Sequence, residues 1–455
     1  MSLSSGGDVE GGVNGKKSEN GAPTLKVFRR RWLVLAAFCF LSLLNGFQWV
    51  QYAIVSDSVA RYYGVSLQAV DWASMVYMLM YVPFVAPASW MLDKKGLRHT
   101  VVLAAVLNCL AAWVKVASGR PDLYAVTMVG QAVAAVTQAF VLAVPARLAA
   151  VWFGAGEVAT ACAIGVFGNQ VGNAFGFLLP PLVVKNQEDV DELGSELRTV
   201  YYGVAAATTL SLLIILLVFQ DAPPVPPSHS QALSQGSTAS SGLLQSIGRL
   251  LRTPGFALLV VTYGISVGAF YAISTVLNLL VNTVFPGNSD AGNIGLVLVV
   301  AGLLGSIVCG VLLDATRKYK EVTLGVYVLS VAGMIAFMAS FLATSIWVVY
   351  LTSFFLGFFL TGYLPLGFEL AVELTYPEPE GTSAGLLNVS AQVFGIVFTE
   401  LCGLPLERQS GAEPAAHLWV NGSLSGALLL GALLTALIPR TLRRQTAQAA
   451  QASVK

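Results

Sequence analysis

Two aromatic residues and two amides recur at one spacing within hydrophobic parts of the chain. Trp49 and Tyr271 are 222 positions apart, and so are Gln170 and Gln392. Two electron-rich rings that converge from distant segments suit a cation without N–H donors, such as a quaternary ammonium, which gains about 0.5–2 kcal/mol per ring. The amides, with Asn45 close to Trp49, can hydrogen-bond a hydroxyl group on the same ligand. This chemistry favours reversible binding of a small organic cation.

Each of these residues also has an ordinary structural explanation. Trp and Tyr concentrate at membrane–water interfaces, and Trp49 lies in the outer half of its hydrophobic segment. Gln side chains hydrogen-bond across neighbouring membrane helices. The binding interpretation therefore rests on the symmetry of the two pairs and on nearby glycines, which let a ligand approach the backbone.

A second group of residues carries charge near the ends of the hydrophobic segments. The stretches WMLDKKGLR (90–98) and GVLLDATRK (310–318) place two aspartates 221 positions apart. An aspartate at a helix end can pair with a basic residue on a neighbouring helix, and such pairs can hold a gate closed. The candidate gating residues are Asp93, Arg98, Arg147, Asp314, Arg317, Glu369 and Glu373. The simpler alternative is that the basic residues only anchor the loops to one side of the membrane.

These side chains need long membrane helices to position them. Of the 455 residues, 56% are hydrophobic and only 11% are charged, whereas soluble proteins carry about 25% charged residues. Long apolar runs without alternation predict helices and argue against barrel strands. Twelve segments reach the length needed to cross a bilayer: 32–56, 70–92, 98–118, 124–152, 156–184, 199–219, 255–285, 292–313, 321–342, 345–372, 382–405 and 416–439.

The near-constant offset indicates an internal duplication. Besides the pairs above, Thr160 and Thr382 are 222 positions apart, and Pro145 and Pro365 are 220 apart. Repeats in parallel topology are related by an axis along the membrane normal, with the substrate between them near the midplane. We expect six-helix halves at 29–220 and 251–444, a cytoplasmic linker at 221–250, and disordered cytoplasmic tails at 1–28 and 445–455.

The distribution of basic residues predicts the orientation. With both termini in the cytoplasm, six of the 25 Lys and Arg residues fall outside and nineteen inside, which satisfies the positive-inside rule. The outside residues are Arg61, Lys115, Arg120, Lys185, Arg198 and Arg408. We expect a multi-pass protein of the plasma membrane that acts as a monomer.

Several function classes are disfavoured. A net charge of +1 argues against nucleic acid as a partner. The chain contains no HExxH, GxSxG or dinucleotide-binding motif, so we expect no enzyme activity. The five cysteines are scattered and form no CxxC pair, so no metal site or cofactor is expected. Without an acidic or histidine relay at mid-membrane depth, uniport is a simpler expectation than proton coupling, and the two-half repeat favours a carrier over a channel.

Longer motifs carry a family resemblance. The two Asp-containing loops resemble the repeated loop motif of the major facilitator superfamily, which implies a fold of two pseudo-symmetric six-helix halves. The stretches NGFQWVQY (45–52), DWASMVYM (71–78), GAFY (268–271) and TGYLPLGFE (361–369) resemble the feline leukaemia virus subgroup C receptor family. The resemblance covers about residues 29–444 and implies transport of choline and ethanolamine, or of heme. It also implies a choline site at Trp49, Tyr271, Gln170 and Gln392, with Asn45 nearby.

Choline and heme make different demands on the chain. Heme iron takes axial His, Cys, Met or Tyr ligands, but the three histidines, His99, His229 and His417, fall in loops or at the ends of hydrophobic segments. A wide apolar cavity could still carry a porphyrin without axial ligation. We therefore expect a uniporter of choline and ethanolamine working by alternating access across the lipid bilayer, with heme transport as the alternative.

Overall fold

Twelve long helices form the structure, a computed structural model. It describes residues 26–154, 157–185, 188–225, 227, 243–285, 290–343, 345–376, 378, 380–408, 416–440 and 443. Twelve helices in these ranges are long and apolar enough to cross a membrane, which confirms the predicted all-α membrane fold. They are α1 Arg30–Val50, α3 Leu67–Lys95, α4 Leu97–Ala117, α5 Tyr124–Trp152, α6 Val158–Val183, α7 Val190–Val218, α10 Pro254–Asn282, α11 Asp290–Thr316, α12 Tyr319–Ser340, α13 Ile346–Thr375, α14 Glu380–Arg408 and α15 Ala416–Ala436.

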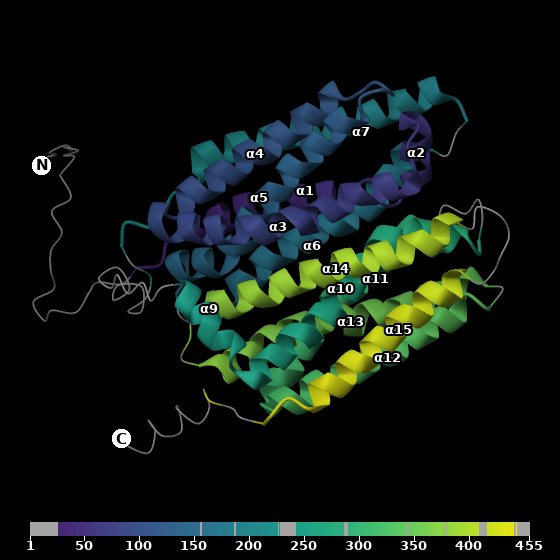
Figure 1. Cartoon of the computed structure of the whole chain (residues 1–455). Helices are drawn as coiled ribbons and strands as arrows, with labels where there is room; N and C mark the ends of the chain where they lie inside the picture. The colour runs from purple at the N-terminus through teal and green to yellow at the C-terminus, as the bar shows by residue number, and fades with distance from the viewer. Residues whose placement is uncertain are drawn as a thin grey trace, which may run out of the picture.

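Two short helices mark the opposite ends of the molecule. Helix α2, Ser56–Tyr63, follows α1 after a turn, and α9, Leu243–Leu251, precedes α10. Figure 1 shows α9 at the end where α1 begins and α15 finishes, and α2 at the other end. We call these the α9 end and the α2 end. The α9 end is the side that the basic residues predict to be cytoplasmic, and α9 falls within the range expected to be a linker.

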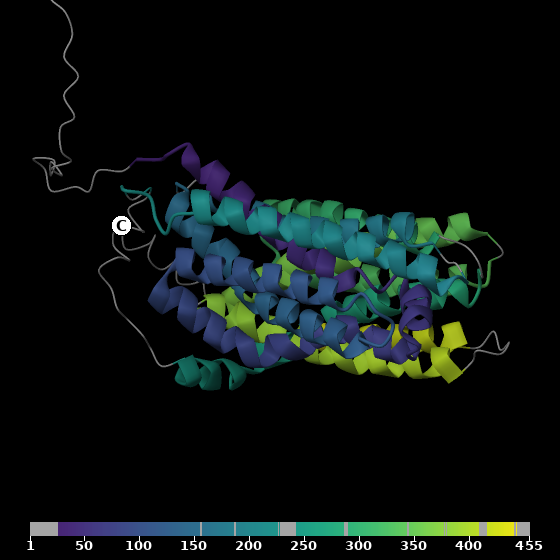
Figure 2. The ribbon, with the colours of Figure 1, turned by 90° about the horizontal axis from the view of Figure 1, so that it is seen from above.

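The helices pack as two similar bundles, α1 to α7 and α10 to α15, which lie side by side (Figure 1). In the first, α1 packs on α6 and α3 on α5; in the second, α10 packs on α14 and α11 on α13. Between the bundles, α3 meets α14 and α6 meets α11, which are equivalent pairings. This agrees with the duplication read from the 222-residue offset. Figure 2 shows the helices running roughly along one common direction, as crossing a bilayer requires.

Close helix approach within each bundle depends on glycine. A Cβ atom at Gly172 of α6 would lie 2.0 Å from the carbonyl oxygen of Leu43 on α1. In the second bundle, a Cβ at Gly357 of α13 would lie 2.1 Å from the carbonyl oxygen of Leu298 on α11. Lipid provides no hydrophobic force that drives helices together, so membrane helices associate through close van der Waals packing. Small residues at the helix interface allow the backbones to approach closely enough for this packing. Each bundle therefore packs tightly as a unit.

The outer surface of the described spans suits lipid. Leu217, Trp347 and Trp419 are 80%, 75% and 73% exposed, although water-soluble proteins rarely expose large contiguous apolar patches. Trp347 lies in the first turn of α13 and Trp419 in the first turn of α15. Aromatic side chains at helix ends are typical of the interface between membrane and water.

Two predicted boundaries differ from the structure by six residues or more, and the others by at most a few residues. The first span was expected to reach residue 56, but α1 ends at Val50 and the chain turns before α2. The sixth was expected from residue 199, but α7 begins at Val190, where the Asp189 side chain accepts hydrogen bonds from the backbone of Asp191 and Glu192. Hydropathy misses this start because a polar N-cap and acidic residues stabilise the first turn of a helix.

Candidate functional site

Trp49 and Tyr271 meet at the boundary between the two bundles. Trp49 lies in the last turn of α1 and Tyr271 near the middle of α10, on the side of its C-terminal half. Their ring centroids are 5.2 Å apart and their planes meet at 82°, an edge-to-face contact. The rings therefore touch directly instead of facing each other across a gap. Two perpendicular rings form two walls of a corner, and a cation placed in such a corner meets both electron-rich faces.

The Trp49 indole is fixed by a reciprocal pair of hydrogen bonds with α3. Its Nε1 donates to the carbonyl oxygen of Ser74 at 3.3 Å, and the Ser74 hydroxyl donates to the carbonyl oxygen of Trp49 at 3.3 Å. Trp49 is 4% exposed. The ring is thus held in one orientation by the neighbouring helix, and its Nε1 donor is already used.

Gln392 of α14 adjoins the aromatic pair. Its side chain lies beside the Tyr271 hydroxyl, and the residue is 2% exposed. Its Nε2 has no hydrogen-bond partner within the described part of the chain. Buried polar groups in native proteins are nearly always paired, so this nitrogen is a donor available to an oxygen of a bound ligand.

Further residues of α3 and α14 complete the neighbourhood, and sequence reasoning missed them. Tyr81 of α3 lies beside Asn388 of α14, across the boundary between the two bundles. A Cβ at Gly395 would lie 2.8 Å from the Met78 sulfur and 3.2 Å from the Tyr271 ring. None of these residues has a residue of similar chemistry 222 positions away, so the internal repeat does not mark them as candidates.

Gln170 and Asn45 contact other groups. Gln170 of α6 is half-buried, and its Oε1 accepts from Asn173 on the same helix at 3.0 Å. Asn45 is fully buried and donates to Asn108 at 3.3 Å and to the carbonyl oxygen of Ala134 at 3.0 Å, inside the first bundle. Neither contact joins the aromatic pair, so a ligand-binding role for these two amides stays a prediction.

Most of the gating candidates of the first bundle lie at the α9 end without bridging the halves. Asp93, Arg98 and Arg147 are exposed. The ion pairs within the described ranges are Arg31–Glu157, Arg249–Glu378 and Arg440–Glu321, so Asp93 and Arg147 are not joined in this conformation.

The gating candidates of the second bundle lie at the same end. Arg317 follows α11 directly and is exposed, with a φ of 53°. Asp314 belongs to the last turn of α11, and its side chain is outside the described residues. Glu369 is exposed and Glu373 is 2% exposed, both in the last turns of α13. Their gating roles remain predictions.

Polar contacts join the two bundles at the α2 end. Asp57 of α2 accepts hydrogen bonds from Asn278 and Asn282 of α10, each at 2.9 Å. Gln68 of α3 donates to Glu400 of α14 at 2.9 Å. In this conformation the halves are therefore tied together on the α2 side of the aromatic pair.

Whether a metal ion can bind depends on the arrangement of the described side chains. Within those ranges, no cluster of three or more His, Cys, Asp or Glu residues has the arrangement of a metal site.

Comparisons with known proteins agree with this architecture. The model of the Major Facilitator Superfamily matches residues 16–399. The choline/ethanolamine transporter FLVCR2 of Homo sapiens is 48% identical over 425 residues, which cover 93% of this chain and 80% of that protein. The choline/ethanolamine transporter FLVCR1 of Felis catus is 49% identical over 426 residues, which cover 93% and 75%.

Solved structures share the fold at low sequence identity. An inward-facing, occupied bacterial homologue of the human lysosomal transporter Spinster has a TM-score of 0.68 and 14% identity, with 91% of this chain and 98% of that one covered. A D-xylose–proton symporter has a TM-score of 0.66 and 13% identity, with 90% and 98% covered. At these identities the likeness concerns the fold alone.

Proposed function

The chain belongs to the major facilitator superfamily and, within it, to the feline leukaemia virus subgroup C receptor family, and from that premise we propose that it is a uniporter of choline and ethanolamine. Membership makes the protein a multi-pass membrane transporter and not an enzyme. The observation that carries the proposal is the perpendicular contact of Trp49 with Tyr271, which brings one ring from each half to a shared corner.

The corner suits the head group of choline. A quaternary ammonium has no N–H donors, so ring faces attract it where hydrogen-bond acceptors cannot. The choline hydroxyl oxygen can accept a hydrogen bond from the unpartnered Nε2 of Gln392 beside Tyr271. Ethanolamine has the same hydroxyl group on a primary ammonium, which can also donate hydrogen bonds to oxygen atoms.

Alternating access explains why the rings come from different halves. In this conformation Asp57 and Glu400 accept hydrogen bonds that close the α2 side. If the halves rock and these contacts break, Trp49 and Tyr271 separate and the corner loses one wall. The cation is then held by one ring only, which favours its release.

The positions of the acidic residues support uniport over proton coupling. The buried acidic residues of the described spans are Asp71, in the first turns of α3, and Glu373, in the last turn of α13, and each lies near a helix end. A proton relay needs titratable groups along the pathway near the middle of the membrane. A carrier that moves only the cation fits this arrangement.

Uptake by aromatic variants tests the site. We expect Trp49→Ala and Tyr271→Ala each to lower kcat/KM for radiolabelled choline by about tenfold or more, since losing about 1.4 kcal/mol corresponds to tenfold. Trp347→Ala, which removes an exposed Trp from the surface, serves as the matched control. Surface expression is measured for each variant. Normal choline uptake by both site variants would refute the proposal.

Substrate and coupling are tested by uptake of choline, ethanolamine and heme side by side in proteoliposomes. Choline carries one positive charge, so a uniporter should respond to membrane potential, at about 2.3 kcal/mol per 100 mV. We expect potassium-diffusion potentials to change choline uptake, and an imposed proton gradient to leave it unchanged. Uptake of heme alone would support the alternative function instead.

A further inference from the structure

Lys115 is a buried lysine inside the first bundle. It was expected on the outer side of the membrane near the end of the span at 98–118, and it lies in the last turn of α4 with 1% exposure. None of the ion pairs within the described part of the chain includes it. Its Nζ donates to Gln131 Oε1 at 2.7 Å and lies 6.0 Å from the centre of the Tyr52 ring. Burying an ammonium without a carboxylate costs several kcal/mol, so the position demands an explanation.

Gln131 of α5 transmits this contact to two other helices. Its Nε2 donates to the carbonyl oxygen of Gln48 on α1 at 2.8 Å and to that of Ala73 on α3 at 3.0 Å. A lysine ammonium can only donate, so Lys115 holds the amide oxygen on its own side. The amide nitrogen is thereby directed at α1 and α3, with both of its N–H groups used.

The contact with Gln48 provides a hydrogen-bond donor for one of the last backbone carbonyl groups of α1. The last four carbonyl groups of a helix have no partner within it, and in a membrane such groups must be satisfied by other protein groups. Two of the four are satisfied by backbone N–H groups of the following turn, and two by side chains of other helices. The carbonyls and their donors are Phe47 with Gln51 N, Gln48 with Gln131 Nε2, Trp49 with Ser74 Oγ, and Val50 with Ala53 N.

The charge of Lys115 also suits this position. The carbonyl end of a helix carries partial negative charge, which favours a cation near the last turn. Lys115 reaches that end through Gln131, whose amide bonds both the ammonium and the carbonyl of Gln48. Lys115 itself lies in the last turn of α4, so the carbonyl ends of α4 and, through Gln131, of α1 both favour a positive side chain here.

We propose that Lys115 and Gln131 are positioning residues that end α1 directly after Trp49 and so set the preference for quaternary over primary ammonium substrates. This inference rests on the proposed transport of choline and ethanolamine. Without the clamp, α1 shifts where it meets α3, and the Trp49 ring leaves the corner with Tyr271. A choline head group depends on the ring faces, whereas the N–H donors of ethanolamine bind oxygen atoms and tolerate the shift.

The test measures kcat/KM for choline and for ethanolamine in proteoliposomes. We expect Lys115→Met and Gln131→Glu each to lower the choline-to-ethanolamine ratio by about tenfold, the effect of about 1.4 kcal/mol. Gln131→Glu is decisive because a carboxylate still pairs with Lys115 but cannot donate to Gln48 or Ala73. Lys115→Arg, which keeps the donor and the charge, should retain the ratio within about threefold.

The exposed Lys185 provides the charge control, since Lys185→Met removes a positive charge from the same end of the bundle. An unchanged ratio in Gln131→Glu, with a lower maximal rate for both substrates, overturns the positioning role and indicates loss of folded carrier only. If Lys115→Met does not reach the membrane, Gln131→Glu decides alone. If the wild-type protein transports neither choline nor ethanolamine, the proposed function is wrong. That result differs from an unchanged choline-to-ethanolamine ratio in the variants, which would refute only the positioning role.

Discussion

At the residue scale, the cationic head group and the hydroxyl group of a ligand would be recognised by different side chains. The rings of Trp49 and Tyr271 can attract any small organic cation, whereas the amide of Gln392 can recognise only a ligand with an acceptor oxygen. The rings would therefore bind the head group of choline and Gln392 its hydroxyl group. A substitution can remove either contribution to ligand binding without the other.

The effect of a Gln392 substitution on ligands with and without a hydroxyl group tests whether Gln392 recognises the hydroxyl. We expect Gln392→Leu to raise the KM for choline about fivefold, because a neutral hydrogen bond contributes about 1 kcal/mol. Inhibition by tetramethylammonium, which has no hydroxyl group, should change by less than about twofold. Inhibition constants for both ligands in the same vesicles provide the measurement, and an equal loss for both would assign Gln392 to ring packing alone.

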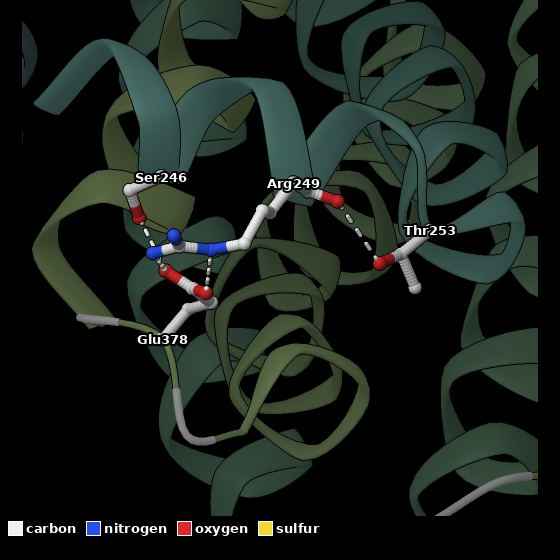
Figure 3. Close-up of polar contacts among 4 residues, drawn as sticks. All are labelled: Ser246, Arg249, Thr253 and Glu378. Atoms are coloured by element: carbon white, nitrogen blue, oxygen red, sulfur yellow. Dashed lines mark hydrogen bonds and ion pairs between the residues drawn. The ribbon is translucent and has the colours of Figure 1, made fainter.

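At the element scale, α9 is fastened to the second bundle by charge. Arg249 donates to both carboxylate oxygens of Glu378, from Nε at 2.7 Å and from a terminal nitrogen at 3.2 Å, and Ser246 also bonds this carboxylate (Figure 3). Glu378 lies in the turn between α13 and α14. These hydrogen bonds, from Arg249 first and then Ser246, lower the pKa of Glu378 below its ordinary value of 4.5.

The lowered pKa gives the docking of α9 a defined pH dependence. A carboxylate whose folded-state pKa is depressed stabilises the docked form above its ordinary pKa, and the effect disappears as pH falls through the lowered value. We expect hydrogen exchange of α9 amides, corrected for the intrinsic rate, to be constant between about pH 6 and 8 and faster only below 4.5.

Substitution of the carboxylate should remove this dependence. In Glu378→Gln, α9 amides should exchange several-fold faster at neutral pH, with no further loss of protection on acidification. Glu321→Gln, which breaks the Arg440–Glu321 pair at the same end of the molecule, is the matched control. Unaltered α9 exchange in Glu378→Gln would mean that apolar packing holds the helix.

At the scale of the whole molecule, the two halves are joined by polar contacts at the α2 end. Asp57 accepts from both Asn278 and Asn282, and hydrogen bonds to a charged group contribute about 1.5–3 kcal/mol each when formed in a covered site. Removing the acceptor should therefore favour conformations in which the α2 end is open, by about tenfold for each 1.4 kcal/mol of lost hydrogen-bond energy.

Distances between spin labels test this shift. We expect Asp57→Ala to increase the population with a long distance between labels at Glu188 and Leu342, two exposed α2-end positions on opposite halves, in a background without native cysteines. Asp191→Ala removes an exposed acidic side chain at the same end and should leave the distribution unchanged. The same distribution in both variants would show that the contacts of Asp57 do not hold the α2 end closed.

The sequence by itself determined the twelve spans, the two halves and the meeting of Trp49 with Tyr271. A long apolar segment in lipid usually forms a helix, because a helix provides hydrogen-bond partners for its own backbone N–H and C=O groups. Duplication then places residues at equal offsets at equal depths on opposite sides of one axis. Those two facts predict that Trp49 and Tyr271 approach each other, and the ring contact between α1 and α10 agrees with that prediction.

Only the tertiary structure decided which way each side chain faces and what it bonds. Gln170 and Gln392 share the repeat offset, yet Gln392 adjoins Tyr271 while Gln170 bonds Asn173 on its own helix. Lys115 counts as an outer-side residue in the distribution of basic residues, yet it is buried and donates to Gln131, which in turn donates to the carbonyl oxygen of Gln48 in α1. Periodicity fixes the depth of a residue, but its rotation about the helix axis and its partners depend on helices distant in sequence.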